Sequence, residues 1–378
     1  MRHRSVLMAA AMLAAAGVVA VGSPAAAADC GQLFDDFAYA SSADGNLTAH
    51  GWVPRGDAGG PGVAGATWSP ANITFPTADG QKVMQLTAYT DGTAGGTGHA
   101  ELFSAQKRYF EGTYASRVRF SDAPASGNDG DHVNQTFFTI SPLAYDLDPT
   151  YSELDVSEYL PNGGWGETGP INYQTTWYTY RNEPWLADNV HSEQRASLNG
   201  WHDLAVQVAG GHVRYFIDGV QVGDHSGKYY PRQTMTINWN QWFIDLAAHS
   251  GGRATYVQQV DWVLHAKNTV LSPAQVTSQV SAHRGAGRTF TDTIADCPGT
   301  TPPSDPPPTD PPATDCGTAA WNISSVYTGG QLVKHERSRA GDPSGPPSGD
   351  GVHLWRARWW TQGSEPGWTQ QWEDRGRC

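Results

Sequence analysis

The sequence predicts an all-β protein in which a large two-sheet sandwich domain is followed by a small β-rich domain. The 43 Gly and 25 Pro residues favour many short strands joined by turns over helical bundles. Runs rich in β-branched and aromatic residues recur through the chain up to about residue 298, whereas long helical periodicity is hard to find. A proline-rich stretch then sets apart the last part of the chain, which is dense in Trp.

The N-terminus has the three parts of a secretory signal. Residues 2–4 are basic, residues 7–21 form an apolar run, and an Ala triplet precedes a cut near Asp29. We therefore expect residues 1–28 to be a signal peptide and the mature protein to be secreted to the extracellular space. A membrane anchor is one alternative, but the apolar run is short. A lipoprotein attached through Cys30 is another, and Asp29 fits it poorly.

The charge of the chain argues against two classes of partner. The formal net charge is −13, and loss of two arginines with the signal brings the mature chain to about −15. A polyanionic nucleic acid or an anionic membrane would be repelled by such a chain. We expect no nucleic-acid and no membrane partner, and a monomer.

Four cysteines are expected to form disulfides. Cys30, Cys297, Cys316 and Cys378 lack the spacing of a zinc site, and an exported chain meets an oxidising environment. Three pairings are possible. The pairing of Cys30 with Cys297 and of Cys316 with Cys378 keeps each bridge inside one domain.

The large domain is predicted to span residues 29–298. Strand-like runs are followed by one candidate for a short helix or irregular cap at residues 272–283. Asp218-Gly219 is a hairpin signal within the last of these runs. The strand-like runs are Thr113–Phe120, His132–Ile140, Leu204–Val208 and Val213–Val222.

The most informative segment is Tyr151–Tyr159, which holds three acids. Side chains alternate along a strand, so Glu153 and Asp155 share a face and Glu158 would point the other way. One β-bulge near Val156-Ser157 would restore its direction, because two residues then oppose one. The sequence therefore predicts three carboxylates in a row on one sheet face.

Aligned carboxylates have a chemical use. Like charges at close range raise at least one pKa, which separates a proton donor from an ionised nucleophile, as glycoside hydrolysis requires. An exposed acidic edge strand and a calcium site are the alternatives. Asp129-Gly130-Asp131-His132 could also bind calcium, although a turn explains it too. We expect no catalytic metal and no cofactor, and leave a structural calcium open.

The motif Glu153-Leu-Asp155-Val-Ser-Glu158 resembles the E-x-D-x-x-E signature of glycoside hydrolase family 16, in the bulged form of laminarinases and bacterial agarases. This resemblance implies a β-jelly-roll sandwich with a concave cleft and a retaining mechanism. It assigns Glu153 as nucleophile, Glu158 as general acid/base and Asp155 as hydrogen-bond partner of the nucleophile. Further segments that resemble the family are Phe34–Phe37, Tyr109–Phe120, Trp201–Val222 and Val260–Val263.

Two features depart from the family pattern and weaken the choice of substrate. Laminarinases usually carry W-P-A-F-W where this chain has Asn134-Gln-Thr-Phe-Phe138, without either Trp. Phe137 or Phe138 could still pack beneath the cleft, and Phe138 is the candidate for substrate binding. Trp165, Trp177 and Tyr180 have no clear counterpart. We predict that these rings bind substrate, with core packing as the alternative.

Residues 299–315 are predicted to be a linker, because proline removes amide donors and favours an extended chain. In residues 316–378, the run Trp359-Trp360-Thr-Gln-Gly resembles carbohydrate-binding modules of families 5 and 12, which bind chitin or cellulose. Trp359, Trp360 and Tyr327 are the candidate sugar-binding rings. A structural Trp pair is the alternative.

These inferences combine into one leading hypothesis. We expect a secreted retaining endo-glycosidase that degrades a polysaccharide, most simply a β-1,3-linked β-glucan, while the C-terminal module holds it on insoluble chitin or cellulose. A transglycosylase that passes the glycosyl group to another sugar is the enzymatic alternative. A sugar-binding protein that has lost catalysis on the same scaffold is the other.

Overall fold

The structure is a computed structural model. It describes residues 31–294 and, in the C-terminal part, residues 317–322, 325–328, 330–336, 352–357, 361–362, 366 and 372–378. The chain divides into two compact units, Met1–Pro298 and Gly299–Cys378. The predicted signal peptide and linker lie outside the described residues, as do Cys30, Cys297 and Cys316. Cys378 is disulfide-bonded, and the pairing scheme stays a prediction.

One face of the large unit is an antiparallel sheet, here named the inner sheet. Its strands follow one another in the spatial order β2, β8, β17, β10, β11, β12 and β13. The bounds are β2 (Trp52–Pro54), β8 (Gly98–Ser104), β10 (Val133–Ile140), β11 (Glu153–Leu160), β12 (Ile171–Arg181), β13 (Leu186–Gln194) and β17 (Thr236–Phe243).

The second layer, here named the outer sheet, is organised around the long strand β18 (Ala254–Lys267). Strands β7 and β1 pair with successive halves of one edge of β18, and β9, β14, β15 and β16 follow on the other side. A single pairing of Tyr89 with Gly98 links β7 to β8 of the inner sheet. The bounds are β1 (Gln32–Asp35), β7 (Met84–Thr90), β9 (Gly112–Phe120), β14 (Gly200–Ala209), β15 (His212–Ile217) and β16 (Val220–Ser226).

Short elements complete the large unit. The remaining strands are β3 (Thr67–Trp68), β4 (Ile73–Thr74), β5 (Thr77–Ala78), β6 (Gln81–Lys82) and β19 (Phe290–Asp292). The helices are α1 (Gly45–Ala49), α2 (Pro273–Gly285) and the 3-10 turns η1 (Pro70–Asn72), η2 (Ala94–Gly96) and η3 (Gly227–Tyr229).

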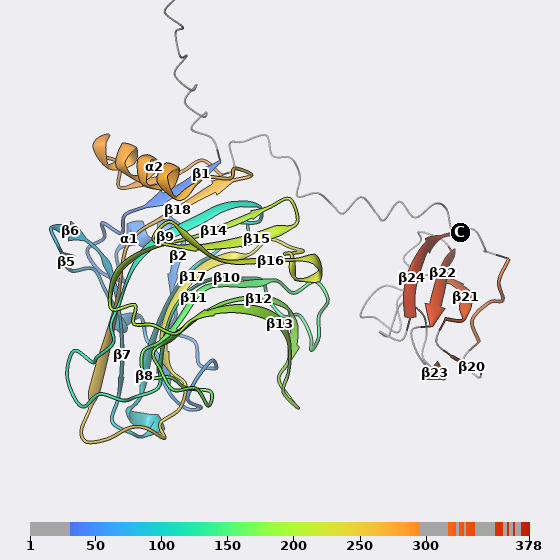
Figure 1. Cartoon of the computed structure of the whole chain (residues 1–378), viewed down its shortest axis with the longest axis horizontal. Coiled ribbons are helices and arrows are strands. Elements are labelled where there is room, and N and C mark those ends of the chain that lie inside the picture. The colour runs from blue at the N-terminus through green and yellow to red at the C-terminus, as the bar shows by residue number, and fades with distance from the viewer. Residues whose placement is uncertain are drawn as a thin grey trace, which may run out of the picture. The chain divides into compact units, whose positions relative to one another are not determined.

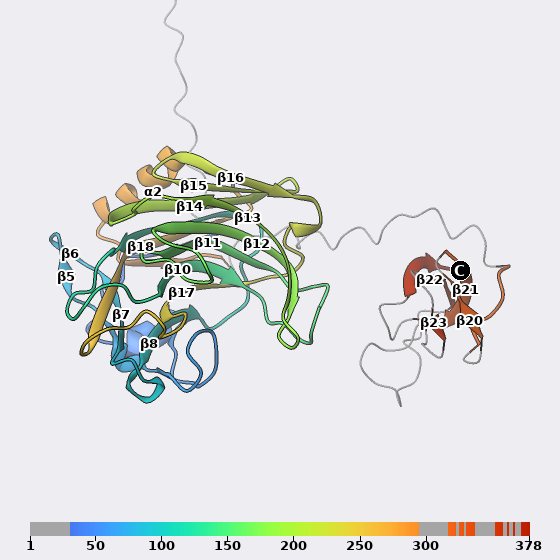
Figure 2. The ribbon, with the colours of Figure 1, turned by 60° about the horizontal axis from the view of Figure 1, so that its bottom comes forward.

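The main core lies between the two sheets, which Figures 1 and 2 show stacked on each other. Alternate residues of facing strands fill it, among them the fully buried Trp52, Phe137 and Trp239, and Phe37 joins them from just after β1. Helix α2 packs through Val276 and Val280 on the outer face of the outer sheet, so that sheet is covered on both sides. Of the helices in the described residues, the longest, α2, thus lies on the outer sheet and not on the inner sheet.

The predicted fold class is confirmed, because the large unit is an all-β jelly-roll sandwich with a concave cleft. Each predicted strand run overlaps an observed strand, and Asp218-Gly219 is the turn between β15 and β16. Asp218 has φ +49° and Gly219 has φ +81°, which is the left-handed backbone that a tight hairpin turn of this kind requires. The candidate helix near residues 272–283 is α2, and Ser272 starts it with a capping box to Gln275.

The small unit has its own aromatic core. Strand β20 (Val326–Tyr327) pairs with β23 (Thr361–Gln362), and β22 (Val352–Ala357) lies between β21 (Leu332–Glu336) and β24 (Trp372–Arg377). Tyr327 packs edge-on against Trp372, and Trp355 lies in the same cluster. Tyr327 is thus a core residue here, with 9 % of its surface exposed, which leaves little of the ring for a sugar. Trp359 and Trp360 lie outside the described residues.

Candidate active site

Strand β11 carries the three acids, and a bulge turns them to one side as predicted. Toward β10, Phe137 pairs with Ser157 and Phe138 pairs with Asp155, which leaves Val156 without a partner. The register toward β12 shifts between Asp155 and Glu158 as well. Leu154, Val156 and Tyr159 consequently face the core, and the acids face the free side of the inner sheet.

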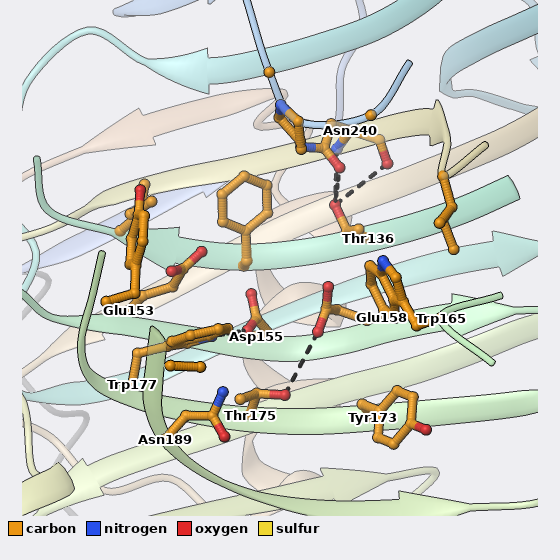
Figure 3. A pocket seen from close by; sticks show the side chains of 18 of the residues that line it. Thr136, Glu153, Asp155, Glu158, Trp165, Tyr173, Thr175, Trp177, Asn189 and Asn240 are labelled. Carbon is orange, nitrogen blue, oxygen red and sulfur yellow. Dashed lines mark hydrogen bonds between the residues drawn. The ribbon is translucent and has the colours of Figure 1, made fainter. Parts of the chain in front are cut away.

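The acids line a cleft of about 1140 Å³ on the inner sheet. Figure 3 shows Glu153, Asp155 and Glu158 as a row along one strand, with Trp177, Thr175 and Tyr173 on the neighbouring strand. The floor also includes Thr136 and Phe138 of β10, Asn240 and Trp242 of β17 and Glu101 of β8 on one side of the row. Asn189, His191 and Glu193 of β13 lie on the other side. The acids therefore lie in the middle of the cleft.

Each acid has its own hydrogen-bond donor. The Tyr151 hydroxyl donates to Glu153 Oε2, and the Trp177 indole N–H donates to Asp155 Oδ2 at 2.8 Å. The Asn134 amide donates to Glu158 Oε1 at 3.1 Å. Thr175 Oγ1 lies 3.5 Å from Glu158 Oε2. Because each donor is an O–H or N–H group, it favours the ionised form of the acid that it touches.

Burial opposes these donors and raises the pKa of all three acids. It raises the pKa of Glu153 to about 8, with a further increase from the charge of Glu158, while the Tyr151 hydrogen bond lowers it. Burial raises the pKa of Glu158 to about 7 against the bonds from Asn134 and Thr175. The pKa of Asp155 is raised well above its usual range by burial and by both neighbouring acids.

The row can therefore hold a proton and a negative charge at the same time near neutral pH. The three carboxyls interact strongly, so protons leave the row as a group rather than from one residue at a time. Two carboxyls that differ in protonation across one small site are what glycosyl transfer needs, one as proton donor and one as nucleophile. The row thus offers a proton donor and an ionised carboxyl within one small site.

All four rings predicted for the large unit line the cleft. Trp165 has 52 % of its surface exposed and lies 5.9 Å from the Trp242 ring, centroid to centroid. Trp177 and Tyr180 lie on β12, with ring centroids 5.8 Å apart. Phe138 lines the floor beside Asp155, whereas its neighbour Phe137 stacks on Trp239 in the core. Whether these rings contact sugar stays a prediction.

Several residues that line the cleft were not predicted from the sequence. Trp185, with 62 % of its surface exposed, extends the Trp177–Tyr180 cluster from the turn between β12 and β13. The sequence does carry a signal for this ring, because Trp185 directly follows Pro184, and a Trp in such a turn is exposed. The donor Asn134 lies on β10, and only the fold brings it to Glu158 on β11. Tyr151 lies two residues before Glu153, but the sequence alone does not show that its hydroxyl turns back to that acid.

One cation lines the cleft, and its donors are already used. Arg55 forms an ion pair of 2.7 Å with Glu101 and donates to the carbonyls of Gly59 and Gly60. Its guanidinium also lies 4.0 Å from the centroid of the Trp68 ring. The other charged residues that line the cleft are acids, so the described site is acidic and offers no unpaired cation.

The other candidate calcium site, Asp129-Gly130-Asp131-His132, has its side chains paired with other residues of the protein. Asp131 pairs with His249 at 2.8 Å, and the His132 ring lies 3.0 Å from Asp245. Asn162 donates to Asp129 at 2.9 Å. Across the described ranges, no group of three or more His, Cys, Asp and Glu side chains is arranged to hold a metal ion.

None of the described helices has the length and hydropathy needed to cross a membrane.

The comparisons with known proteins gave distant structural similarities. No protein-family model matches the sequence, and no curated protein matches it either. A β-glucanase of Bacillus licheniformis is similar at 17% identity and TM-score 0.44, over 63% of this chain and 98% of the other. A glycoside hydrolase family 16 endo-glucanase from Bacteroides ovatus is similar at 15% identity and TM-score 0.45, over 61% and 98%. The kappa-carrageenase from Pseudoalteromonas carrageenovora is similar at 15% identity and TM-score 0.43, over 65% and 98%.

Proposed function

We propose that the protein is a retaining glycoside hydrolase that cleaves an uncharged β-glucan inside the chain. The observation that carries the proposal is the row of Glu153, Asp155 and Glu158 in the middle of a concave cleft, with a bulge that turns all three to the same side. Buried like charges in a row destabilise a fold, so this arrangement calls for a catalytic explanation.

Two carboxyls carry the proposed reaction. Glu153 attacks the anomeric carbon, while Glu158 gives its proton to the oxygen of the leaving sugar as the glycosidic C–O bond breaks. Glu158, now ionised, takes a proton from water, which attacks the same carbon and releases Glu153. Asp155 lies between them and, in the role that the family resemblance implies, tunes the ionisation of Glu153, although the hydrogen bond recorded for its Oδ2 comes from Trp177. The sugar thereby regains its original configuration.

The form of the cleft supports an endo mode and an uncharged substrate. Lining residues extend on both sides of the acids, from Glu101 on β8 to Glu193 on β13, so a chain can continue past the cleavage point in both directions. A sulfated or carboxylated polysaccharide would meet acids without a free cation to pair with, at a cost in affinity. The β-1,3 linkage is proposed on the resemblance of the acid motif to laminarinases.

We further propose that the chain is secreted and held on insoluble chitin or cellulose through residues 316–378. The signal-like N-terminus and the Trp-rich run at residues 359–363 support this part. Deletion of residues 302–378 should abolish retention on insoluble chitin and leave hydrolysis of a soluble substrate unchanged. Undiminished retention of the shortened chain would refute the anchoring role.

The activity is tested by release of reducing ends from laminarin, lichenan, agarose and chitin. The proposal expects release from a β-glucan, with product sizes typical of internal cleavage, and none from Glu153→Gln. Elongated products from laminarin oligosaccharides would instead identify a transglycosylase. Binding without release from any of the four polysaccharides would identify a sugar-binding protein.

A further inference from the structure

Tyr151 is a buried phenol whose role the reaction above leaves unexplained. Its side chain is 0 % exposed, and its hydroxyl donates to Glu153 Oε2. Burial and the neighbouring Glu153 raise the pKa of Tyr151 well above its usual value, so the phenol stays protonated and acts as a donor. One oxygen of Glu153 is therefore occupied by a neutral O–H, and Oε1 is left for attack on the anomeric carbon.

The main chain of Tyr151 is held by a distant arginine. The Arg232 guanidinium donates to the Tyr151 carbonyl and, at 2.7 Å, to the Tyr178 carbonyl. Arg232 also lies over the Tyr178 ring at 4.4 Å, and its own backbone N–H donates to Ser152 Oγ at 2.8 Å. Arg232 does not line the cleft.

These contacts place the Arg232 guanidinium between β11 and β12, beside two of the three residues that donate to the acids. Tyr151 directly precedes β11 and donates to Glu153, and Trp177 lies next to Tyr178 on β12 and donates to Asp155. The pairing of β12 with β13 shifts register between Trp177 and Thr179, so the backbone at Tyr178 is irregular. Nη2 of the guanidinium donates to both carbonyls, and Nη1 donates to the carbonyls of Lys228 and Tyr230. The two arms of the fork thus tie both strands to the segment before Arg232, which a lysine with a single nitrogen cannot do.

We propose that Tyr151 and Arg232 are positioning residues for the nucleophile. Tyr151 holds Oε2 of Glu153 and fixes the plane of its carboxylate, and Arg232 holds Tyr151. This inference rests on the proposed function, because it assigns to Glu153 the attack on the anomeric carbon.

The test compares Tyr151→Phe with Tyr114→Phe on the β-glucan that the unaltered enzyme cleaves. Tyr114 is a matched control, since it is also 0 % exposed and its hydroxyl donates to a backbone carbonyl, that of Phe110. Loss of a hydrogen bond to a charged group should lower kcat about 10- to 100-fold in Tyr151→Phe, with KM within about twofold. The acidic limb of the pH profile should move to higher pH, because Glu153 loses the donor that favours its ionised form.

Arg232 is tested by Arg232→Lys, which keeps the charge and loses the fork. It should lower kcat about 3- to 10-fold at constant KM and move the acidic limb in the same direction. Arg284→Lys is its control, since Arg284 pairs with Asp261 near helix α2 on the far side of the sandwich. An unmoved pH profile and kcat in folded Tyr151→Phe would overturn the inference while the loss of activity in Glu153→Gln still upheld the hydrolase. Full activity of Glu153→Gln would overturn both.

Discussion

The two faces of the inner sheet are formed by the same strands and have opposite effects on the stability of the fold. On β11, Leu154, Val156 and Tyr159 face the core and are at most 1 % exposed. Glu153, Asp155 and Glu158 alternate with them and face the cleft, where burial raises their pKa. The core face stabilises the fold through apolar burial, whereas the cleft face destabilises it by keeping acids together. This contrast predicts that substitutions on the two faces separate activity from stability.

The largest expected effect is on the cleft face. Glu153→Gln should lower kcat/KM about 10⁴-fold or more, because the nucleophile is lost, and Glu158→Ala about 10²- to 10⁴-fold on ordinary polysaccharides. Initial rates of reducing-end release measure both. Glu167→Gln is the control, since Glu167 lines the cleft outside the row and pairs with Arg195 at 2.9 Å. Equal losses in all three variants would contradict the assigned roles.

The reverse effect is expected on the core face. Leu154→Ala should lower the free energy of unfolding by about 2–5 kcal/mol, because it leaves a cavity between the sheets. Activity per folded molecule should remain within about threefold, since the side chain points away from the cleft. Denaturant unfolding and titrated initial rates measure the two quantities. A large loss of activity without loss of stability would show that the faces are not independent.

The buried acids of the cleft face should also make the free energy of unfolding depend on pH. Above about pH 4.5 the unfolded chain ionises the three acids, while burial keeps protons on the row in the folded chain, so stability falls as pH rises toward neutral and beyond. Glu153→Gln removes part of this loss and should raise the free energy of unfolding by about 1–3 kcal/mol at pH 8, with little change at pH 4. Thermal unfolding at the two pH values gives the comparison. An equal change at both would refute the electrostatic explanation.

The smallest expected effect concerns the exposed rings at the end of the cleft. Trp185→Ala should raise KM about 3- to 10-fold and leave kcat nearly unchanged, because an exposed ring that packs on Trp177 and not on an acid contributes equal binding in ground and transition states. Trp201→Ala is the control, as Trp201 lies on the outer sheet and donates to Asp79. An unchanged KM in Trp185→Ala would remove this ring from the substrate-binding site.

The sequence predicted the sandwich and the orientation of the three acids because both depend on local pattern. Alternation along β11 and the extra residue near Val156 are readable in a run of nine residues. The residues that donate hydrogen bonds to the acids, or hold those donors, were harder to predict from the sequence. Asn134 meets Glu158 across two strands, and Arg232 reaches Tyr151 over 81 positions of the chain, so these contacts depend on sheet topology. Tyr327 was predicted as a candidate sugar-binding ring, and the structure places it in the aromatic core that a small unit needs, which the sequence pattern could not show.

The central claim is that Glu153 and Glu158 act together in double displacement across one small site. Proton NMR of the first product released from a β-glucan by the unaltered enzyme tests it most directly. The account predicts that the new reducing end appears first as the β-anomer, because two displacements at one carbon restore the starting configuration. Initial release of the α-anomer would mean a single displacement by water and would contradict the role of Glu153 as nucleophile.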